Sequence, residues 1–357
     1  MARKNIGSEI MSIQTDSLFC ILDNSQLSPL LSKNKVLYLN SPDFLRKYGF
    51  SIIFYEHFIE TGQNNTQESF NDKFRKLASV NTFKYIGMKN MLLPRIVDLF
   101  EYEIFLRYKY GNINIDELKN LISENISDFI IPSNVNDAEL LSQINKSSKL
   151  DKLFWSILNA INTESFFNTN IVEVIKSNPK LRPRDLFGAI EHAYSPIKDR
   201  FKKQEESKNL MNEYFNEIKT KKHVPSYASG LLFKNAIKQG VEKNLTLESF
   251  TYELIFEVVK EQALNTYKIQ DNNLKNLGYN DTLLWKLFFN CLKSLTSDYQ
   301  KNKVKKIQLS DIYDIYFLCC SVLFKTYVDK RTFALGKKIE LKLGINLIIE
   351  KAKELEY

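Results

Sequence analysis

The hydrophobic pattern of the chain changes twice, and this change constrains the fold most strongly. In the first 60 residues, short apolar runs alternate with polar breaks, as in strands interleaved with helices. From about residue 84 to about residue 300, apolar residues recur every three or four positions, which predicts long helices. The last 50 residues return to the mixed pattern. We therefore expect an α/β domain built from residues 1–83 and 300–357, and an all-helical insertion of residues 84–299 packed on it.

The expected sheet elements are short. Strands are predicted at 17–22, 36–39, 51–54, 325–328 and 345–349. Short helices are predicted at 25–31, 43–48, 310–324 and 332–343, with Gly49 ending the second of them. Longer helices are predicted at 91–108, 116–129, 137–158, 183–192, 196–221, 227–243, 247–267 and 281–295. The absence of a fixed repeat in the sequence argues against a solenoid.

Composition supports a folded chain that stays in the cytoplasm. The 357 residues are 44% hydrophobic and 26% charged, enough for one large or two modest domains. The longest largely apolar run, 315–324, is far shorter than the roughly 18 residues that cross a bilayer. Polar residues follow Arg3 and Lys4 where an export signal would be apolar. We expect a cytoplasmic location and no membrane partner.

Several kinds of active site are excluded by their missing motifs. The sequence has neither a G-x-x-x-x-G-K-[ST] loop nor a G-x-G-x-x-G turn, which argues against nucleotide-driven motors and Rossmann dehydrogenases. It has three histidines, no H-E-x-x-H and no C-x-x-C, so a zinc site is not expected. Any metal would have to be held by carboxylates. The net charge of +8 permits an anionic partner such as nucleic acid, although a lysine-rich composition alone gives the same charge.

Four carboxylates occupy special places in the predicted topology. Asp23 and Asp329 each follow a predicted strand, Glu60 lies near the end of a helix, and Asp311 lies at the start of another. Residues just beyond the carboxyl ends of parallel strands converge on one crevice, so such acids can be neighbours. A divalent cation relieves the repulsion between them, and oxygen ligands suit Mg²⁺ or Mn²⁺. Such an ion can activate water for the hydrolysis of a phosphodiester.

Four motifs carry a resemblance to a known family. They are Phe19-Cys20-Ile21-Leu22-Asp23-Asn24-Ser25, Glu60-Thr61-Gly62, Ser310-Asp311-Ile312-Tyr313-Asp314 and Thr326-Tyr327-Val328-Asp329-Lys330. Over roughly residues 15–82 and 300–355 the chain resembles the PIN-like nuclease domain. The separations of 37 residues between the first two acids and 18 between the last two look like compact bacterial members.

The resemblance implies that Asp23, Glu60, Asp311 and Asp329 are catalytic and hold Mg²⁺ or Mn²⁺. It implies a nuclease that prefers RNA over DNA, and a toxin or antiviral defence role would fit such an enzyme. The middle of the chain is not covered by the resemblance.

Alternatives remain open for each acid. Asp314 lies three residues from Asp311, and Glu56 four residues from Glu60, so each is a second candidate for a ligand on the same helix face. Asp23 is also compatible with an ordinary turn, and Asp311 with a helix cap. If all the acids have such structural roles, the chain is a non-catalytic helical interaction protein.

A basic run precedes Asp311. Its members are Lys301, Lys303, Lys305 and Lys306. They are candidate substrate-binding residues, because lysines near a metal can hold a phosphate backbone. A solvated loop is the alternative interpretation. The helical insertion is the candidate surface for a protein partner.

Overall fold

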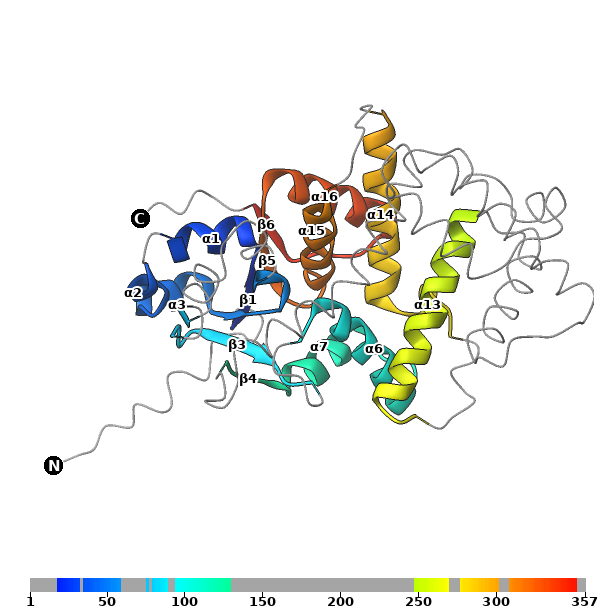
Figure 1. Ribbon diagram of the computed structural model, residues 1–357, viewed down its shortest axis with the longest axis horizontal. Coiled ribbons are helices and arrows are strands. Elements are labelled where there is room, and N and C mark those ends of the chain that lie inside the picture. Colours follow the sequence, from blue (N-terminus) through cyan, green and yellow to red (C-terminus); the bar gives the residue numbers. More distant parts are fainter. Residues whose placement is uncertain are drawn as a thin grey trace, which may run out of the picture. The chain divides into compact units, whose positions relative to one another are not determined.

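The computed structural model describes eight stretches of the chain (Figure 1). They are residues 18–32, 35–58, 75–76, 79–88, 94–129, 247–269, 277–301 and 308–351. The helices predicted at 137–158, 183–192, 196–221 and 227–243 lie outside these stretches, so they remain predictions.

The described residues divide into two compact units. The boundaries fall between Leu99 and Phe100, between Lys109 and Tyr110, and between Ile312 and Tyr313. We call the described residues of 18–99, 110–129 and 313–351 the sheet unit, and those of 100–109 and 247–312 the helical unit.

The sheet unit contains a mixed six-stranded sheet, so the predicted α/β class is confirmed. The strands are β1 (Phe19–Leu22), β2 (Phe50–Ile52), β3 (Phe83–Ile86), β4 (Ile126–Asp128), β5 (Lys325–Val328) and β6 (Ile349–Lys351). Their order is β4-β3-β2-β1-β5-β6, and every neighbouring pair is parallel except β3 with β4. Both ends of the chain contribute to this sheet, as the hydrophobic pattern predicted.

The order in which the chain adds parallel strands to the sheet reverses at β1. From β1 the chain adds β2 and β3 on one side, whereas β5 and β6 lie on the other side of β1. In open α/β sheets, ligands bind beyond the carboxyl ends of the strands at such a reversal. A functional site is therefore expected beyond the carboxyl ends of β1 and β5.

The first face of the sheet is covered by three short helices near the N-terminus. These are α1 (Asn24–Ser32), α2 (Val36–Leu39) and α3 (Pro42–Tyr48), drawn in blue in Figure 1. Cys20 and Leu22 of β1 share one buried cluster with Leu27 of α1 and Phe44 of α3. Alternate strand residues point to opposite faces, so this cluster is the core of the first face.

The opposite face is covered by α15 (Leu309–Cys320) and α16 (Lys330–Leu343), drawn in orange and red in Figure 1. A Cβ atom placed on Gly336 of α16 would lie 2.5 Å from Cδ1 of Ile349 and 2.8 Å from Cδ1 of Leu318. Glycine therefore allows α16 to approach β6 and α15 closely. The two helix layers bury the central strands β1 and β5 on both sides.

The strand predicted at 36–39 is wrong, because these residues form the helix α2. Leu37 is 86% exposed, whereas Leu39 is fully buried. Residues two apart lie on the same face of a strand but on different faces of a helix, so this burial pattern requires a helical turn. An apolar run of four residues has no periodicity that distinguishes the two structures.

The prediction that residues 84–299 are entirely helical is also wrong at two places. Residues 84–86 lie in β3, and the predicted helix 116–129 is instead α7 (Ile115–Ser123) followed by β4. β4 pairs with β3 through Ile126 and Ile86, so it adds an antiparallel edge to the sheet. The last predicted strand, 345–349, is observed later, as β6, where it pairs with β5.

The helical unit contains two long helices, α13 (Leu247–Thr266) and α14 (Leu283–Lys301), and most of α6 (Ile96–Tyr110). The predicted helix 247–267 is confirmed, and that predicted at 281–295 is observed at Leu283–Lys301. Glu103 of α6 is fully buried, and its carboxylate accepts hydrogen bonds from the backbone N–H groups of Leu283 at 2.6 Å and Leu284 at 2.8 Å. One side chain thus supplies partners for the free N–H groups that begin α14. No helix in the described stretches is long and apolar enough to cross a membrane.

Candidate active site

Asp23 lies directly beyond β1, where the chain turns into α1. Its backbone N–H donates to the carbonyl of Tyr327 in β5 at 3.0 Å, which places it beside the end of the neighbouring strand. Its carboxylate accepts from the backbone N–H of Ser25 at 3.3 Å and from the Ser25 hydroxyl at 3.2 Å. The residue is 3% exposed. Asp23 is therefore a buried acid held in place at the start of a helix.

Asp329 occupies the equivalent place beyond β5. It is the N-cap of α16, and its Oδ1 accepts from the backbone N–H of Thr332 at 2.6 Å. The same order of strand, aspartate and helix thus occurs on two adjacent parallel strands. The backbone N–H of Asp329 lowers the pKa of the Asp23 carboxyl, whereas the negative charge of the Asp329 side chain raises it, so the two positions interact electrostatically.

Asp314 on α15 is the third acid at this place. Its Oδ2 lies 2.5 Å from Nη2 of Arg331, the second residue of α16. The pKa of Asp314 is raised to about 7, chiefly by burial and also by the charges of Asp23 and Asp329, while Arg331 opposes these effects. We call Asp23, Asp314 and Asp329 the acidic cluster.

The folded protein disfavours the ionised form of the Asp23 carboxyl. Burial raises the pKa of this carboxyl above its usual value, and the negative charge of Asp329 adds to the rise. The hydrogen bonds from Ser25 and from the backbone of Asp329 act in the opposite direction. Repulsion between buried carboxylates is the condition that a bound cation relieves.

His57 and Asn24 fix the end of β1. Nε2 of His57 lies 2.8 Å from the carbonyl of Leu22, and its Nδ1 accepts from the backbone N–H of Phe54 at 2.9 Å. Burial lowers the pKa of His57 to about 4, so the imidazole is neutral and donates from Nε2 to Leu22. The side chain of Asn24 donates to the carbonyl of Glu56 at 3.1 Å. Asp23 is the residue between these two fixed points.

Sequence reasoning missed His57 and Asn24 as positioning residues. Their partners, Leu22 and Glu56, are 35 and 32 residues away, and both bonds involve backbone carbonyls that carry no sequence signal. The available hint was a histidine and an acid, His57 and Glu56, within the apolar stretch around 52–58. Buried polar side chains of this kind normally have a specific partner.

Glu56, the second candidate for the helical glutamate, supports the start of α6. It is fully buried, its Oε2 accepts from the backbone N–H of Ile96 at 3.1 Å, and its Oε1 lies 3.6 Å from Nε of Arg95. These contacts give Glu56 a structural role at a helix N-terminus. Glu60 lies outside the described residues.

Asp311 belongs to the helical unit and is 2% exposed. Its Oδ2 accepts from the backbone N–H of Gln308 at 2.8 Å. Gln308 directly precedes α15 and Asp311 is the third residue of this helix, so the bond is the one that a capping acid makes. The alternative of a capping role is thus observed for Asp311. Among the predicted basic residues, Lys301 is exposed at the end of α14, and Lys303, Lys305 and Lys306 lie outside the described residues.

The donor chemistry of the acidic cluster fits a hydrated divalent cation. Within the described stretches, no group of three or more His, Cys, Asp or Glu side chains already has the arrangement of a metal site. Mg²⁺ does not need such a group, because it keeps several waters and is commonly held by one or two carboxylates and a substrate phosphate. Asp23 and Asp329 offer two buried or half-buried carboxylates beside each other, and Asp314 is a third.

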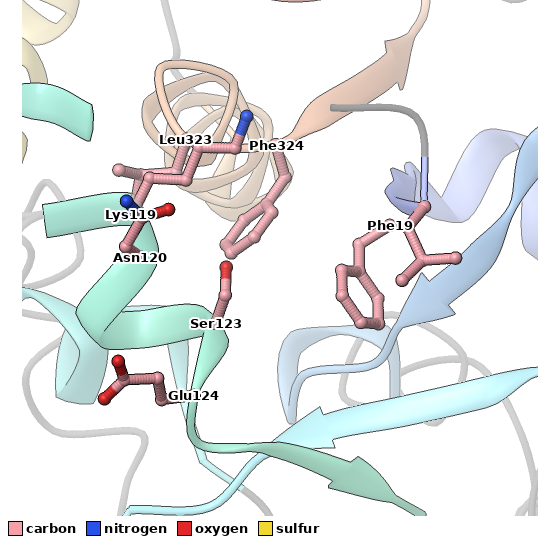
Figure 2. Close-up of a pocket in the computed structure, with 8 residues that line it drawn as sticks. Phe19, Lys119, Asn120, Ser123, Glu124, Leu323 and Phe324 are labelled. Carbon is pink, nitrogen blue, oxygen red and sulfur yellow. The ribbon is translucent and has the colours of Figure 1, made fainter. Parts of the chain in front are cut away.

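A cavity of about 480 Å³ lies elsewhere in the sheet unit, as Figure 2 shows. Phe19, at the start of β1, and Phe324, just before β5, line it together with Lys119, Ser123 and Glu124 from the region of α7. Phe19 and Phe324 are at the amino ends of β1 and β5, opposite to the ends that carry Asp23 and Asp329. The cavity is therefore separate from the acidic cluster.

Comparisons with protein-family models, with curated proteins and with solved structures found no match. The class of protein that the fold and the site define is an α/β protein with coupled carboxylates at the reversal point of its sheet.

Proposed function

We propose that this protein is a metal-dependent nuclease that hydrolyses the phosphodiester bonds of nucleic acid, with RNA preferred over DNA. The observation that carries the proposal is the acidic cluster, three electrostatically coupled aspartates beyond the carboxyl ends of β1 and β5. Ligand sites of open α/β sheets occur at this position, and carboxylate oxygens are the ligands that Mg²⁺ and Mn²⁺ prefer. The PIN-like motifs described above support the same reaction.

In this proposal, Asp23 and Asp329 hold the ion, and Asp314 is a further ligand. When bound, Mg²⁺ or Mn²⁺ would acidify its water and neutralise the charge of the phosphate. The contacts of Asp23 with Ser25 and of Leu22 with His57 keep the Asp23 carboxylate in one orientation. Little reorganisation is then needed when the substrate binds, which is a general source of catalytic power.

The remaining predictions complete the proposal. Glu60 is proposed as an additional acid, and the lysines at 301, 303, 305 and 306 as contacts to the phosphate backbone. Asp311 keeps its capping role at the start of α15. The part of the predicted insertion that follows β4, residues 130–299, is proposed to select the substrate or a protein partner. A role in toxin or antiviral defence is consistent with such an enzyme. The alternative function is a non-catalytic interaction protein.

A cleavage assay tests the proposal. Purified wild-type protein is incubated with end-labelled single strands of RNA and of DNA of mixed sequence, with Mn²⁺ or with EDTA. We expect cleavage with Mn²⁺ only, and a loss of about 100-fold or more in the Asp23→Asn and Asp329→Asn variants, because the ion supplies several kcal/mol of charge stabilisation.

Asp43→Asn is the matched control, because Asp43 is an exposed acid on α3 that pairs with Arg46. This variant should cleave like the wild type. Failure of the wild type to cleave either nucleic acid with Mn²⁺ would contradict the proposal, and so would full activity in Asp23→Asn.

A further inference from the structure

Arg331 occupies an electrostatically unfavourable position in its helix. It is the second residue of α16, directly after Lys330, and the acid at this helix start is the N-cap Asp329, whereas the first turn itself contains none. The partial charge at a helix N-terminus is positive, so cations in the first turn are disfavoured and acids are favoured. Helix stability alone does not account for an arginine here. Its role has to come from the contacts of its guanidinium group.

The guanidinium group lies at the edge of the acidic cluster. Nη2 of Arg331 is 2.5 Å from Oδ2 of Asp314, and Arg331 lowers the pKa of this carboxyl against the effects of burial and of Asp23. The side chain of Asp314 is 15% exposed, whereas that of Arg331 is 51% exposed. The buried acid therefore holds the arginine at one end while half of the arginine surface remains accessible to a ligand in solvent.

A site made only of acids repels a polyanionic substrate. With all three aspartates ionised, the acidic cluster and Arg331 together carry a formal charge of −2, which attracts a divalent cation but not a phosphate. A guanidinium group presents several N–H donors in a planar fork that matches two phosphate oxygens. Arg331 thus has both the charge and the geometry that a phosphate beside the cluster would need.

We propose that Arg331 is a substrate-binding residue that holds a nucleic-acid phosphate next to the acidic cluster, and that Asp314 positions it. This inference rests on the proposed function, because it assigns the phosphate contact of the same site. A purely structural role of the Arg331–Asp314 pair is the competing interpretation. The two differ in what substitution does to substrate affinity and to metal affinity.

The test measures cleavage and Mn²⁺ binding in the Arg331→Gln and Arg331→Lys variants. In Arg331→Gln we expect KM to rise about tenfold or more with a smaller change in kcat, because a charge-assisted phosphate contact is lost. The slope of log affinity against log salt should flatten by about 0.7, the value for one contact to a single strand. Mn²⁺ affinity should be unchanged or higher, because a positive neighbour is removed. Arg331→Lys should retain the salt slope with an intermediate KM.

Arg46→Gln is the matched control. Arg46 forms an equivalent pair with Asp43 at 2.6 Å on α3, on an exposed surface. This variant should show the KM and salt slope of the wild type. Circular dichroism melting of each variant confirms that it is folded.

The possible outcomes separate the inference from the proposed function. If the wild type cleaves with Mn²⁺ and Arg331→Gln keeps its KM and its salt slope, the inference is wrong and the proposed function stands. If Arg331→Gln binds Mn²⁺ more weakly and loses kcat at unchanged KM, Arg331 supports the metal centre and the inference is again wrong. If the wild type does not cleave, the proposed function fails and the inference fails with it.

Discussion

Asp23 and Asp329 show that a structural and a functional role can belong to the same side chain. Each follows a strand and begins a helix, and each accepts hydrogen bonds from the first turn of that helix. When only the sequence was considered, an ordinary turn was the alternative to metal binding for Asp23. In the structure, the cap explains how each carboxylate is oriented, and burial with mutual repulsion explains why a cation would be favourable there.

The pKa of Asp314 leads to a prediction about stability and pH. Its pKa is raised to about 7 in the folded state, so the folded protein binds more protons than the unfolded chain between about pH 4 and pH 7. Stability of the wild type without metal should therefore fall as the pH rises through this window. In Asp314→Asn this loss is absent, so the variant should become more stable than the wild type by about 1 kcal/mol or more at pH 7.5.

Urea unfolding in EDTA at pH 5 and pH 7.5 measures this difference. The lowered pKa of His57 has the opposite effect on the pH dependence of stability. His57 is present in both proteins, so its contribution cancels in the difference between them. A stability difference between Asp314→Asn and the wild type that is the same at both pH values would show that Asp314 is not held in the way described.

At the residue level, the sequence was informative where a local signal existed. Asp23 and Asp329 follow buried strands as expected, because an apolar run that ends in aspartate marks the end of a strand. The sequence did not predict that His57 and Asn24 fix the end of β1, since these bonds join residues far apart in the chain. It also left open the choice between Asp311 and Asp314, and the structure brings Asp314 to the acidic cluster.

At the level of elements, the predictions succeeded where the hydrophobic pattern and both ends of the element were clear. The strand at 325–328 and the long helix α13 are observed almost as predicted, because each has a clear pattern and clear ends. Gly49 ends α3 at a φ of 77°, a conformation that glycine adopts without strain. The short runs at 36–39 and 126–128 were assigned to the wrong type of structure. Tertiary contacts decide the conformation of such runs.

The start of α14 provides a prediction about stability. Glu103→Ala removes a buried carboxylate that accepts from Leu283 and Leu284 and pairs with Arg107 at 2.7 Å. Buried donors would then lack a partner, so the helical unit should lose about 3 kcal/mol of stability. Urea unfolding followed by tryptophan fluorescence, to which the buried Trp285 of this unit contributes, measures the loss.

Glu117→Ala is the control for this variant. Glu117 also caps a helix, α7, but it is exposed, so its removal should cost about 1 kcal/mol or less. If the two substitutions had equal effects, burial would not be the reason for the importance of Glu103.

At the level of the whole molecule, the net charge of +8 increases the affinity for nucleic acid only if some of the basic side chains contact the substrate. Substituting Gln for the four lysines at 301, 303, 305 and 306 should weaken RNA binding and flatten its salt dependence by about 0.7 per lost contact. Mn²⁺ affinity should stay nearly constant, because carboxylates hold the ion. Fluorescence anisotropy at several salt concentrations provides the measurement. An unchanged salt slope would mean that these lysines form a solvated loop.

The central claim is that the acidic cluster binds a divalent cation, and titration of the metal-free protein with Mn²⁺ by calorimetry tests it most directly. The account predicts a saturable site in the wild type and in Asp43→Asn, and its loss or strong weakening in Asp23→Asn and Asp329→Asn. The absence of a saturable site in the wild type, or an undiminished site in Asp23→Asn, would contradict the account.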